Sequence, residues 1–113
     1  MNIELEEQHP WDASFANTLP GQLVLVGLAY FVDDGEVPFE QEQLFGRVVS
    51  VDQSKGILLS LEGQTTGEQY NLPPDTRSFR EAAPGEYRLR STGEVVVDPD
   101  YTVTFSIRKQ AKA

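Results

Sequence analysis

Residues 22–32 read QLVLVGLAYFV, an uncharged run that is apolar on both sides of any strand drawn through it. Leu23 and Leu25 fall on one face of such a strand, and Val24 and Val26 fall on the other. A strand in a sheet with one face in water alternates apolar and polar residues. The run therefore predicts a strand that is covered on both faces.

Two kinds of cover are expected for this strand: the wall of a closed barrel together with residues 11–19, or a second subunit. A buried helix is the competing assignment, because an all-apolar run shows no decisive period. Gly27, the valines and the turn that follows favour the strand.

Asp34-Gly35 follows the strand and suits a two-residue hairpin turn, since both central residues of that turn need positive φ. Such a turn predicts Val32 opposite Val37. Pro38 has no N–H to donate to a ladder, so an edge or a bulge is expected where the return strand begins.

Turn residues recur at intervals of about ten residues farther along the chain. The segments DQSKG at 52–56 and EGQTTG at 62–67 separate predicted strands at 47–51, 57–61 and 68–72. This spacing is typical of a meander that packs as a sandwich or a barrel.

Two segments are predicted to form short helical turns. Trp11, Phe15 and Leu19 recur at i, i+4 and i+8, which places them on one face of the first. Asp75 is positioned as the N-cap of the second, over residues 76–82.

Residues 86–98 predict a hairpin with a three-residue loop that ends in Gly93. The cross-strand pairs expected from that loop are Arg90–Glu94, Leu89–Val95 and Tyr87–Val97. The last segment, YTVTFSIR at 101–108, alternates throughout. Its inward side chains are expected to be those of Tyr101, Val103, Phe105 and Ile107.

About six to eight short strands and one or two helical turns make the predicted fold class mainly β. The expected architecture is a small antiparallel barrel or a two-layer sandwich of SH3-like size. A chain of 113 residues fits one domain. We expect a flexible acidic leader at 1–10, a single β-rich domain at 11–108 and a loose tail at 109–113.

The charge is unevenly divided along the chain. The sequence holds 18 acidic and 9 basic residues, for a net charge of −9. Nine of the acids and none of the bases lie in residues 1–46, so the nine acids and nine bases of 47–113 cancel. This negative field disfavours nucleic acid and anionic membranes as partners.

Several kinds of chemistry find no support in the sequence. His9 is the single histidine, and it lies in the predicted leader, where no base is held near a partner. With no cysteine, thiolate metal sites and cysteine nucleophiles are excluded. The acids do not match the spacing of a calcium loop, and no phosphate-binding glycine loop occurs. No catalytic residue, metal or cofactor is predicted.

The candidate interaction surface combines four arginines with five acids. Arginine is preferred where planar contact to a carboxylate matters. One interpretation is local ion pairing, and the other is docking of the arginines on the acidic edge of the same chain or a second copy. The residues are Arg77, Arg80, Arg88, Arg90, Asp33, Asp34, Glu36, Glu40 and Glu42.

These features favour a non-enzymatic protein–protein interaction module that forms a homodimer, or that binds another protein. The alternative is a small anionic-ligand binder or minor enzyme, with Arg77, Arg80 and Tyr70 as its first candidates. Nucleic-acid binding through the same arginines ranks third. The lack of cysteine and of a signal-like or membrane-spanning segment points to a cytoplasmic protein.

Overall fold

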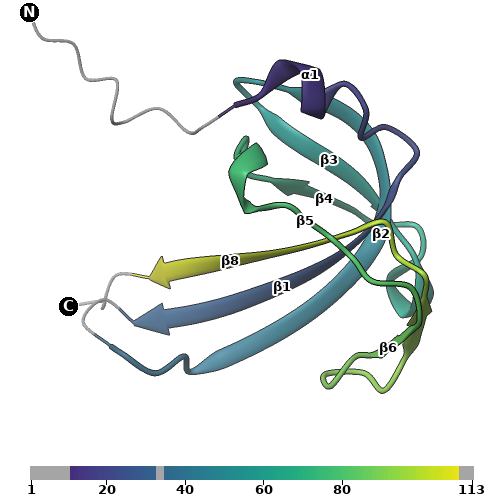
Figure 1. Ribbon diagram of the computed structural model, residues 1–113. Coiled ribbons are helices and arrows are strands. Elements are labelled where there is room, and N and C mark those ends of the chain that lie inside the picture. The colour runs from purple at the N-terminus through teal and green to yellow at the C-terminus, as the bar shows by residue number, and fades with distance from the viewer. Residues whose placement is uncertain (1–10, 33–34, 110–113) are drawn as a thin grey trace, which may run out of the picture.

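The structure, a computed structural model, describes residues 11–32 and 35–109. It is mainly β, as predicted (Figure 1). The elements are α1 (Ala13–Ala16), β1 (Leu23–Val32), β2 (Glu40–Asp52), β3 (Gly56–Leu61), the 3-10 turn η2 (Gly63–Thr65), β4 (Gln69–Leu72), the 3-10 turn η3 (Thr76–Ser78), β5 (Arg80–Glu81), β6 (Glu86–Arg88), β7 (Val95–Val97) and β8 (Tyr101–Lys109).

The strands form a six-stranded sheet in the order β4-β3-β2-β1-β8-β5 and a separate two-stranded sheet, β6-β7. The large sheet curls strongly, but β4 and β5 at its two edges do not pair, so it is not a closed barrel (Figure 1). It is also not wholly antiparallel, because β1 and β8 run parallel. The predicted antiparallel barrel is wrong in both respects. Of the predicted two-layer sandwich, the structure has only the small β6–β7 sheet packed on β1.

Asp100 sets the parallel pairing of β8 with β1. Its backbone N–H donates to the carbonyl of Leu23 at 2.8 Å, and its carboxylate accepts from the Leu23 N–H at 2.8 Å. The chain therefore returns from the β6–β7 hairpin to the end at which β1 begins, and β8 can only run alongside β1 in the same direction.

The main core fills the inner face of the curled sheet. Val24 and Val26 of β1 are fully buried there, and the predicted final-strand residue Val103 is buried with them. Trp11, Phe15 and Leu19 all pack on this core, as their spacing predicts. The predicted helix is a single turn, capped by the Asp12 carboxylate, which accepts from the Phe15 N–H.

The opposite face of β1 is covered by the β6–β7 hairpin. Leu23 and Leu25 form a second core with Leu89 and Val96 of that hairpin. The prediction of a strand covered on both faces is confirmed for the first half of β1. On this face the predicted cover, a barrel wall or a second subunit, is wrong, because a hairpin of the same chain covers β1.

The hairpin register differs by one residue from the prediction. Tyr87 pairs with Val96, and the Gly93 N–H donates to the Leu89 carbonyl, which gives a four-residue loop. A shift of one residue turns every side chain of one strand to the other face. Val96 consequently faces the core in place of Val95, and the predicted Arg90–Glu94 pair does not form.

The connection between β1 and β2 is also longer than predicted. Tyr30 pairs with Glu40, and the Phe39 N–H donates to the Tyr30 carbonyl at 2.8 Å. Val37 lies outside the strand, so the predicted Val32–Val37 pair is wrong. Pro38 has no N–H, which explains why the ladder begins one residue later. Asp33 and Asp34 lie outside the described residues.

The second predicted helical segment begins as expected and then departs. The Asp75 carboxylate caps η3 by accepting from the Arg77 N–H at 2.9 Å. Arg80 belongs to β5 and pairs with Thr102 of β8. Residues 80 and 81 are therefore extended, where the prediction was a helical turn. The predicted leader at 1–10 and residues 110–113 of the predicted tail lie outside the described residues, and Lys109 ends β8.

Candidate functional interface

Three strands extend beyond the rest of the molecule as an arm, made of residues 28–32 of β1, 40–43 of β2 and 104–109 of β8 (Figure 1). The remaining described residues are called the body. β3 pairs with β2 only from Gly46 onward, and β5 pairs with β8 only at Tyr101 and Thr102. The arm is therefore three strands wide, where the body has six.

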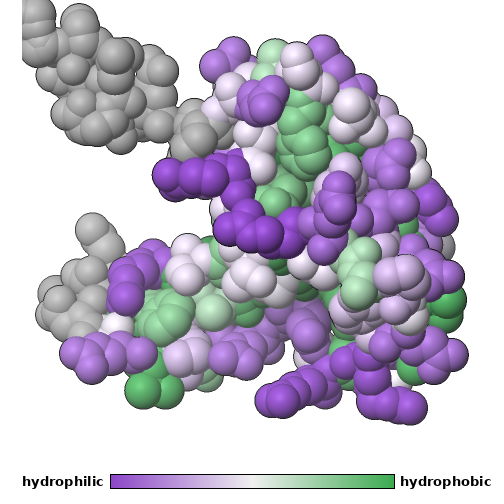
Figure 2. Space-filling view, in the orientation of Figure 1, coloured by the Kyte–Doolittle hydropathy of each residue, from purple (hydrophilic) through white to green (hydrophobic). Residues whose placement is uncertain are grey.

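The burial of β1 ends just inside the arm, after Leu28, which is 2% exposed. Residues 23–26 are all buried, whereas residues 29–31 are partly buried and Val32 is 48% exposed. Figure 2 shows a hollow between the arm and the part of the molecule that carries α1. The inner face of the arm borders this hollow with partly buried side chains, among them Tyr30, Phe105 and Ile107.

The outer edge of β8 has no strand beside it after Thr102 among the described residues. The Ala82 N–H donates to the Asp100 carbonyl, and Arg80 pairs with Thr102. Asp100 and Thr102, the even-numbered residues at the start of β8, therefore turn backbone groups toward β5. Backbone groups of successive residues point to opposite edges of a strand. It follows that the outward groups along the arm belong to Thr104, Ser106 and Arg108.

An unpaired strand edge is a template for another strand. The usual protections are few here. Proline is absent from β8, and β8 spans nine residues, Tyr101–Lys109, without a break. The inner-face residues from Tyr101 to Ile107 are apolar, and the charged residues of β8, Arg108 and Lys109, stand at its end. The Arg108 guanidinium lies 4.7 Å from the centre of the Phe31 ring.

Exposed apolar side chains gather at the free end of the arm. Val32, Val37 and Phe39 are 48%, 77% and 52% exposed. The Phe39 ring lies 6.3 Å from the ring of Tyr30. Exposed apolar groups that adjoin one another mark interaction sites more often than scattered ones do.

Glu40 and Glu42 share the inner face of the arm, as their alternation predicts, because they lie opposite Tyr30 and Leu28. The Tyr30 hydroxyl donates to the Glu42 carboxylate at 3.0 Å. Burial and this hydrogen bond to an anion raise the pKa of Tyr30 to about 12, so the phenol stays neutral at physiological pH.

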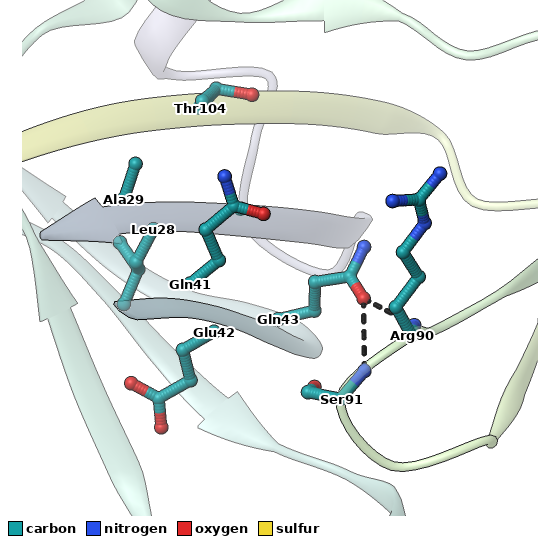
Figure 3. Close-up of a pocket in the computed structure, with 9 residues that line it drawn as sticks. Leu28, Ala29, Gln41, Glu42, Gln43, Arg90, Ser91 and Thr104 are labelled. Atoms are coloured by element: carbon teal, nitrogen blue, oxygen red, sulfur yellow. Dashed lines mark hydrogen bonds between the residues drawn. The ribbon is translucent and has the colours of Figure 1, made fainter. Parts of the chain in front are cut away.

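The outer face of the arm carries a shallow hollow of about 510 Å³ (Figure 3). Its wall is the loop of the β6–β7 hairpin, held by Gln43, whose side-chain oxygen accepts from the Arg90 N–H at 2.5 Å and from the Ser91 N–H at 3.4 Å. Ala29, Gln41 and Thr104 contribute small or neutral polar groups to the rest of the lining, and Glu42 contributes a carboxylate. Arg90, in the hairpin loop, is the cationic residue of this lining, and one arginine gives the hollow little positive charge with which to select an anion.

The four candidate arginines do not converge. Arg77 lines a hollow with Trp11 and Phe79, whereas Arg80 lines a different one with Ser78 and Thr104. The remaining two belong to the hairpin, Arg88 in β6 and Arg90 in the loop. Tyr70, the third residue of the predicted anion site, packs on the main core from β4. The hollows lined by Arg77 and Arg80 are therefore different, and Tyr70 lines neither of them.

Carbonyl oxygens accept hydrogen bonds from the side chains of two of these arginines. The Arg80 guanidinium donates to the carbonyls of Arg77 and Phe79, and that of Arg88 donates to the Gly93 carbonyl. No ion pair joins the four to Glu36, Glu40 or Glu42 within residues 11–32 and 35–109. Docking of the arginines on a second copy stays a prediction.

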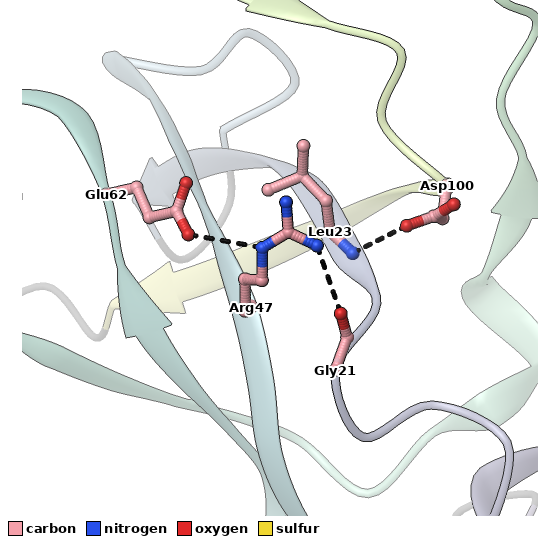
Figure 4. A network of polar contacts seen from close by, with 5 residues as sticks. All are labelled: Gly21, Leu23, Arg47, Glu62 and Asp100. Atoms are coloured by element: carbon pink, nitrogen blue, oxygen red, sulfur yellow. Dashed lines mark hydrogen bonds and ion pairs between the residues drawn. The ribbon is translucent and has the colours of Figure 1, made fainter.

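The ion pair that does form in the described part of the chain lies in the body (Figure 4). Arg47 contacts Glu62 at 3.4 Å and donates to the Gly21 carbonyl at 3.1 Å. Beside it, Asp100 holds the Leu23 N–H. These contacts fix the start of β1 to β2 and β8, and they serve the fold.

The sequence prediction missed Arg108. The signal was available, because YTVTFSIR places Arg108 on the polar face with Thr104 and Ser106. The sequence alone does not show that this strand lies at an edge that the other described strands leave unpaired.

No protein-family model, curated protein or solved structure matches this chain. None of the helices in the described ranges has the length and apolar character needed to cross a membrane.

Proposed function

We propose that the protein is a non-enzymatic protein–protein interaction module that binds partner proteins through its arm, with a second copy of itself as the first partner. The observation that carries the proposal is the outer edge of β8 along residues 103–109, which pairs with no other strand of residues 11–32 and 35–109. Such an edge accepts an extended segment through main-chain hydrogen bonds, and alternate side chains supply specificity.

A second β8 fits this edge in antiparallel orientation. With Ser106 opposite its own copy, Thr104 of each molecule lies opposite Arg108 of the other, and all three residues turn their backbone groups outward. The inner faces then bring Phe105 beside Ile107. The contact is self-complementary and closes at two molecules, as a twofold dimer requires.

The exposed end of the arm supports the same proposal. Val32, Val37 and Phe39 present apolar surface next to the strand edges. Burial of such groups contributes about 25 cal/mol per Å² removed from water. Main-chain pairing would fix the register, and this apolar surface would add affinity.

Sedimentation of the full chain from micromolar to millimolar concentration tests the proposal. We expect the mass to rise to that of a dimer, and Ser106→Pro to remove the rise, because proline deletes an outward N–H at an edge where the fold tolerates it. Ser106→Ala is the matched control and should dimerise normally. A strict monomer at every concentration would refute self-association.

The salt dependence separates two kinds of dimer. A β8–β8 contact rests on backbone pairing and apolar burial, so 0.5 M salt should leave it nearly unchanged. Docking of the arginine group on the acidic edge of a second copy should weaken several-fold under the same conditions, because exposed charges are screened.

A further inference from the structure

A small hollow lies where β5 begins beside β8. It has a volume of about 310 Å³ and is lined by Ser78, Arg80 and residues 102–104. Arg80 pairs with Thr102, and no other described strand pairs with the outer edge of β8 beyond that point. The hollow is therefore the place where a strand added to this edge would meet β5.

The Arg80 guanidinium is held in position beside this edge. Its Nη1 donates to the Arg77 carbonyl at 2.8 Å and to the Phe79 carbonyl at 3.0 Å. These bonds turn the side chain back toward the residues that precede β5, on the side where the unpaired part of the edge begins. A guanidinium has donors on all three of its nitrogens, so Nε and Nη2 are left for another acceptor.

The positive charge of Arg80 is not neutralised locally. No carboxylate within residues 11–32 and 35–109 forms an ion pair with it. The adjacent acid, Glu81, lines a different hollow with Asp100. Glu40 and Glu42 belong to β2, two strand spacings from β8. Two spacings are about 10 Å, a distance over which about 0.1 M salt screens exposed charges.

We propose that the outer edge of β8 binds the carboxyl-terminal end of a partner protein, as an antiparallel strand whose terminal carboxylate is bound by Arg80. The inference rests on the proposed function, because it needs this edge to accept a strand. It deepens that function by naming the chemistry of the partner, which is an extended segment with a free chain end.

An antiparallel strand on this edge has room to end but little room to continue. Arg80 already occupies the position opposite Thr102, and the next residue with outward backbone groups is Thr104. Two residues of a strand span about 7 Å, so about one further residue fits between a residue opposite Thr104 and Arg80. A segment that ends opposite Thr104 directs its carboxylate toward the guanidinium, whereas a longer chain must leave the sheet there.

The charge of Arg80 also selects the direction of the bound strand. In the antiparallel direction, the terminal carboxylate accepts from the outward Thr104 N–H as well as from Arg80. Backbone N–H groups and arginine are the donors that suit a carboxylate best. A parallel strand would bring its amino-terminal end to Arg80, and the ammonium group of a free end would be repelled. The main-chain bonds supply most of the affinity, so one arginine is enough to distinguish the two ends.

The two faces of the arm specify the side chains of the partner. In an antiparallel pair, residues directly opposite one another point to the same face. The second and fourth residues from the partner's end then lie beside Phe105 and Ile107 on the inner face, where apolar groups fit. The fifth lies opposite Arg108, where an acid fits. The expected partner therefore ends in an alternating segment with apolar residues at its second and fourth positions from the end.

Two synthetic peptides test the inference on the full chain, at a concentration where sedimentation gives a monomer. Both are acetyl-Glu-Val-Thr-Val-Thr, one with a free carboxylate and the other with a terminal amide. NMR titration of the labelled protein measures both affinities. We expect the acid to bind about three- to tenfold more tightly than the amide, because it alone forms a charge-assisted contact. Both should shift the amide signals of Thr104, Ser106 and Arg108.

Substitutions assign the preference to Arg80. Arg80→Gln should lower the affinity for the acid to that for the amide and leave the amide peptide's affinity unchanged. Arg88→Gln is the matched control, because it makes the same change in β6 of the hairpin, and it should keep the preference. Thermal unfolding checks that each variant is folded. The comparison of the two peptides on the wild type decides the inference even where a variant is unstable.

The outcomes separate this inference from the proposed function. Equal affinities for the two peptides overturn the inference, and binding along β8 would still support the proposed function. A preference for the acid that persists in Arg80→Gln also overturns the inference. Binding of neither peptide, with a dimer that Ser106→Pro removes, overturns the inference alone. Binding of neither together with a monomer at every concentration overturns both.

Discussion

β1 and β8 run side by side through both the body and the arm, and the same two strands behave differently in each. In the body, Val24, Val26 and Val103 are buried between the curled sheet and its covering. In the arm, Tyr30, Phe105 and Ile107 have the same alternation but remain half-exposed. The difference shows that alternating apolar residues indicate only that one face of a strand is suited to burial. They do not say whether the covering is supplied by the described part of the same molecule.

The largest difference expected between the two regions is in the free energy of unfolding. Leu59→Ala removes a fully buried side chain from the main core and should cost about 2–5 kcal/mol. Phe39→Ser, at the exposed end of the arm, should change stability by less than about 0.5 kcal/mol. Chemical denaturation measures both. Equal costs would show that the arm is part of the cooperative core.

The hairpin cover can be removed separately. Leu89→Ala deletes a buried side chain of the second core and should cost about 2–3 kcal/mol, at the lower end for leucine because a small hairpin can settle into the cavity. Val95→Ala is the matched control, because its side chain is 40% exposed. A negligible loss in Leu89→Ala would contradict the assignment of the hairpin as the second cover of β1.

Two glycines of the body allow the same substitution, one packed against β3 and the other at the border with the arm. A Cβ at Gly46, in the body, would collide with the Ser60 carbonyl oxygen and lie 2.9 Å from the Leu61 Cα, so Gly46→Ala should cost about 1–3 kcal/mol. A Cβ at Gly27, which lines the hollow of Figure 3, meets its nearest atom, the Thr104 hydroxyl oxygen, at 3.6 Å. Gly27→Ala should be neutral or slightly stabilising. Thermal unfolding of the pair tests the contrast.

The smallest effect concerns the polar contact on the inner face of the arm. Tyr30→Phe removes the hydrogen bond to Glu42 and should cost about 0.5–1.5 kcal/mol at neutral pH. The wild type also carries a pH dependence that the variant lacks. The unfolded phenol ionises from about pH 10, whereas the folded one keeps its proton to about 12, so this stabilisation is complete below pH 10 and is lost as the pH rises to 12.

Ultraviolet titration of the tyrosines checks this assignment. The step at the highest pH should disappear in Tyr30→Phe, and the stability of the variant should fall less steeply between pH 10 and 12. An unchanged titration curve would mean that Tyr30 is not held by Glu42 in solution.

Local features were predictable because their causes lie within a few residues. The turn at 52–56 is one example. The Asp52 carboxylate accepts from the Ser54 hydroxyl at 2.7 Å and from the backbone N–H groups of Lys55 and Ser54, and these bonds lower the pKa of Asp52. The Asp75 cap and the alternation of β8 are determined in the same way. The registers at Val37 and Val95 were missed because one residue of loop length, which no side-chain pattern fixes, decides them.

The candidate interface was predicted only in part. The alternation of Glu40 and Glu42 placed both on one face, and their strand does form an exposed region of the sheet. The arginine group of 77–90 was recognisable as a cluster in the sequence, but the structure distributes it over η3, β5, β6 and the hairpin loop. The sequence cannot show that dispersal, since it depends on where each short element docks.

By itself the sequence determined that this chain builds strands, that β1 is apolar on both faces, and that the net negative charge comes from residues 1–46. Each follows from residue types and their spacing. Only the tertiary structure decided what covers β1, that β8 runs parallel to it, and that no other described strand pairs with the outer edge of β8 after Thr102. Those properties depend on which distant strands meet, and strand pairing is settled by contacts such as Asp100 with Leu23, 77 residues apart in the chain.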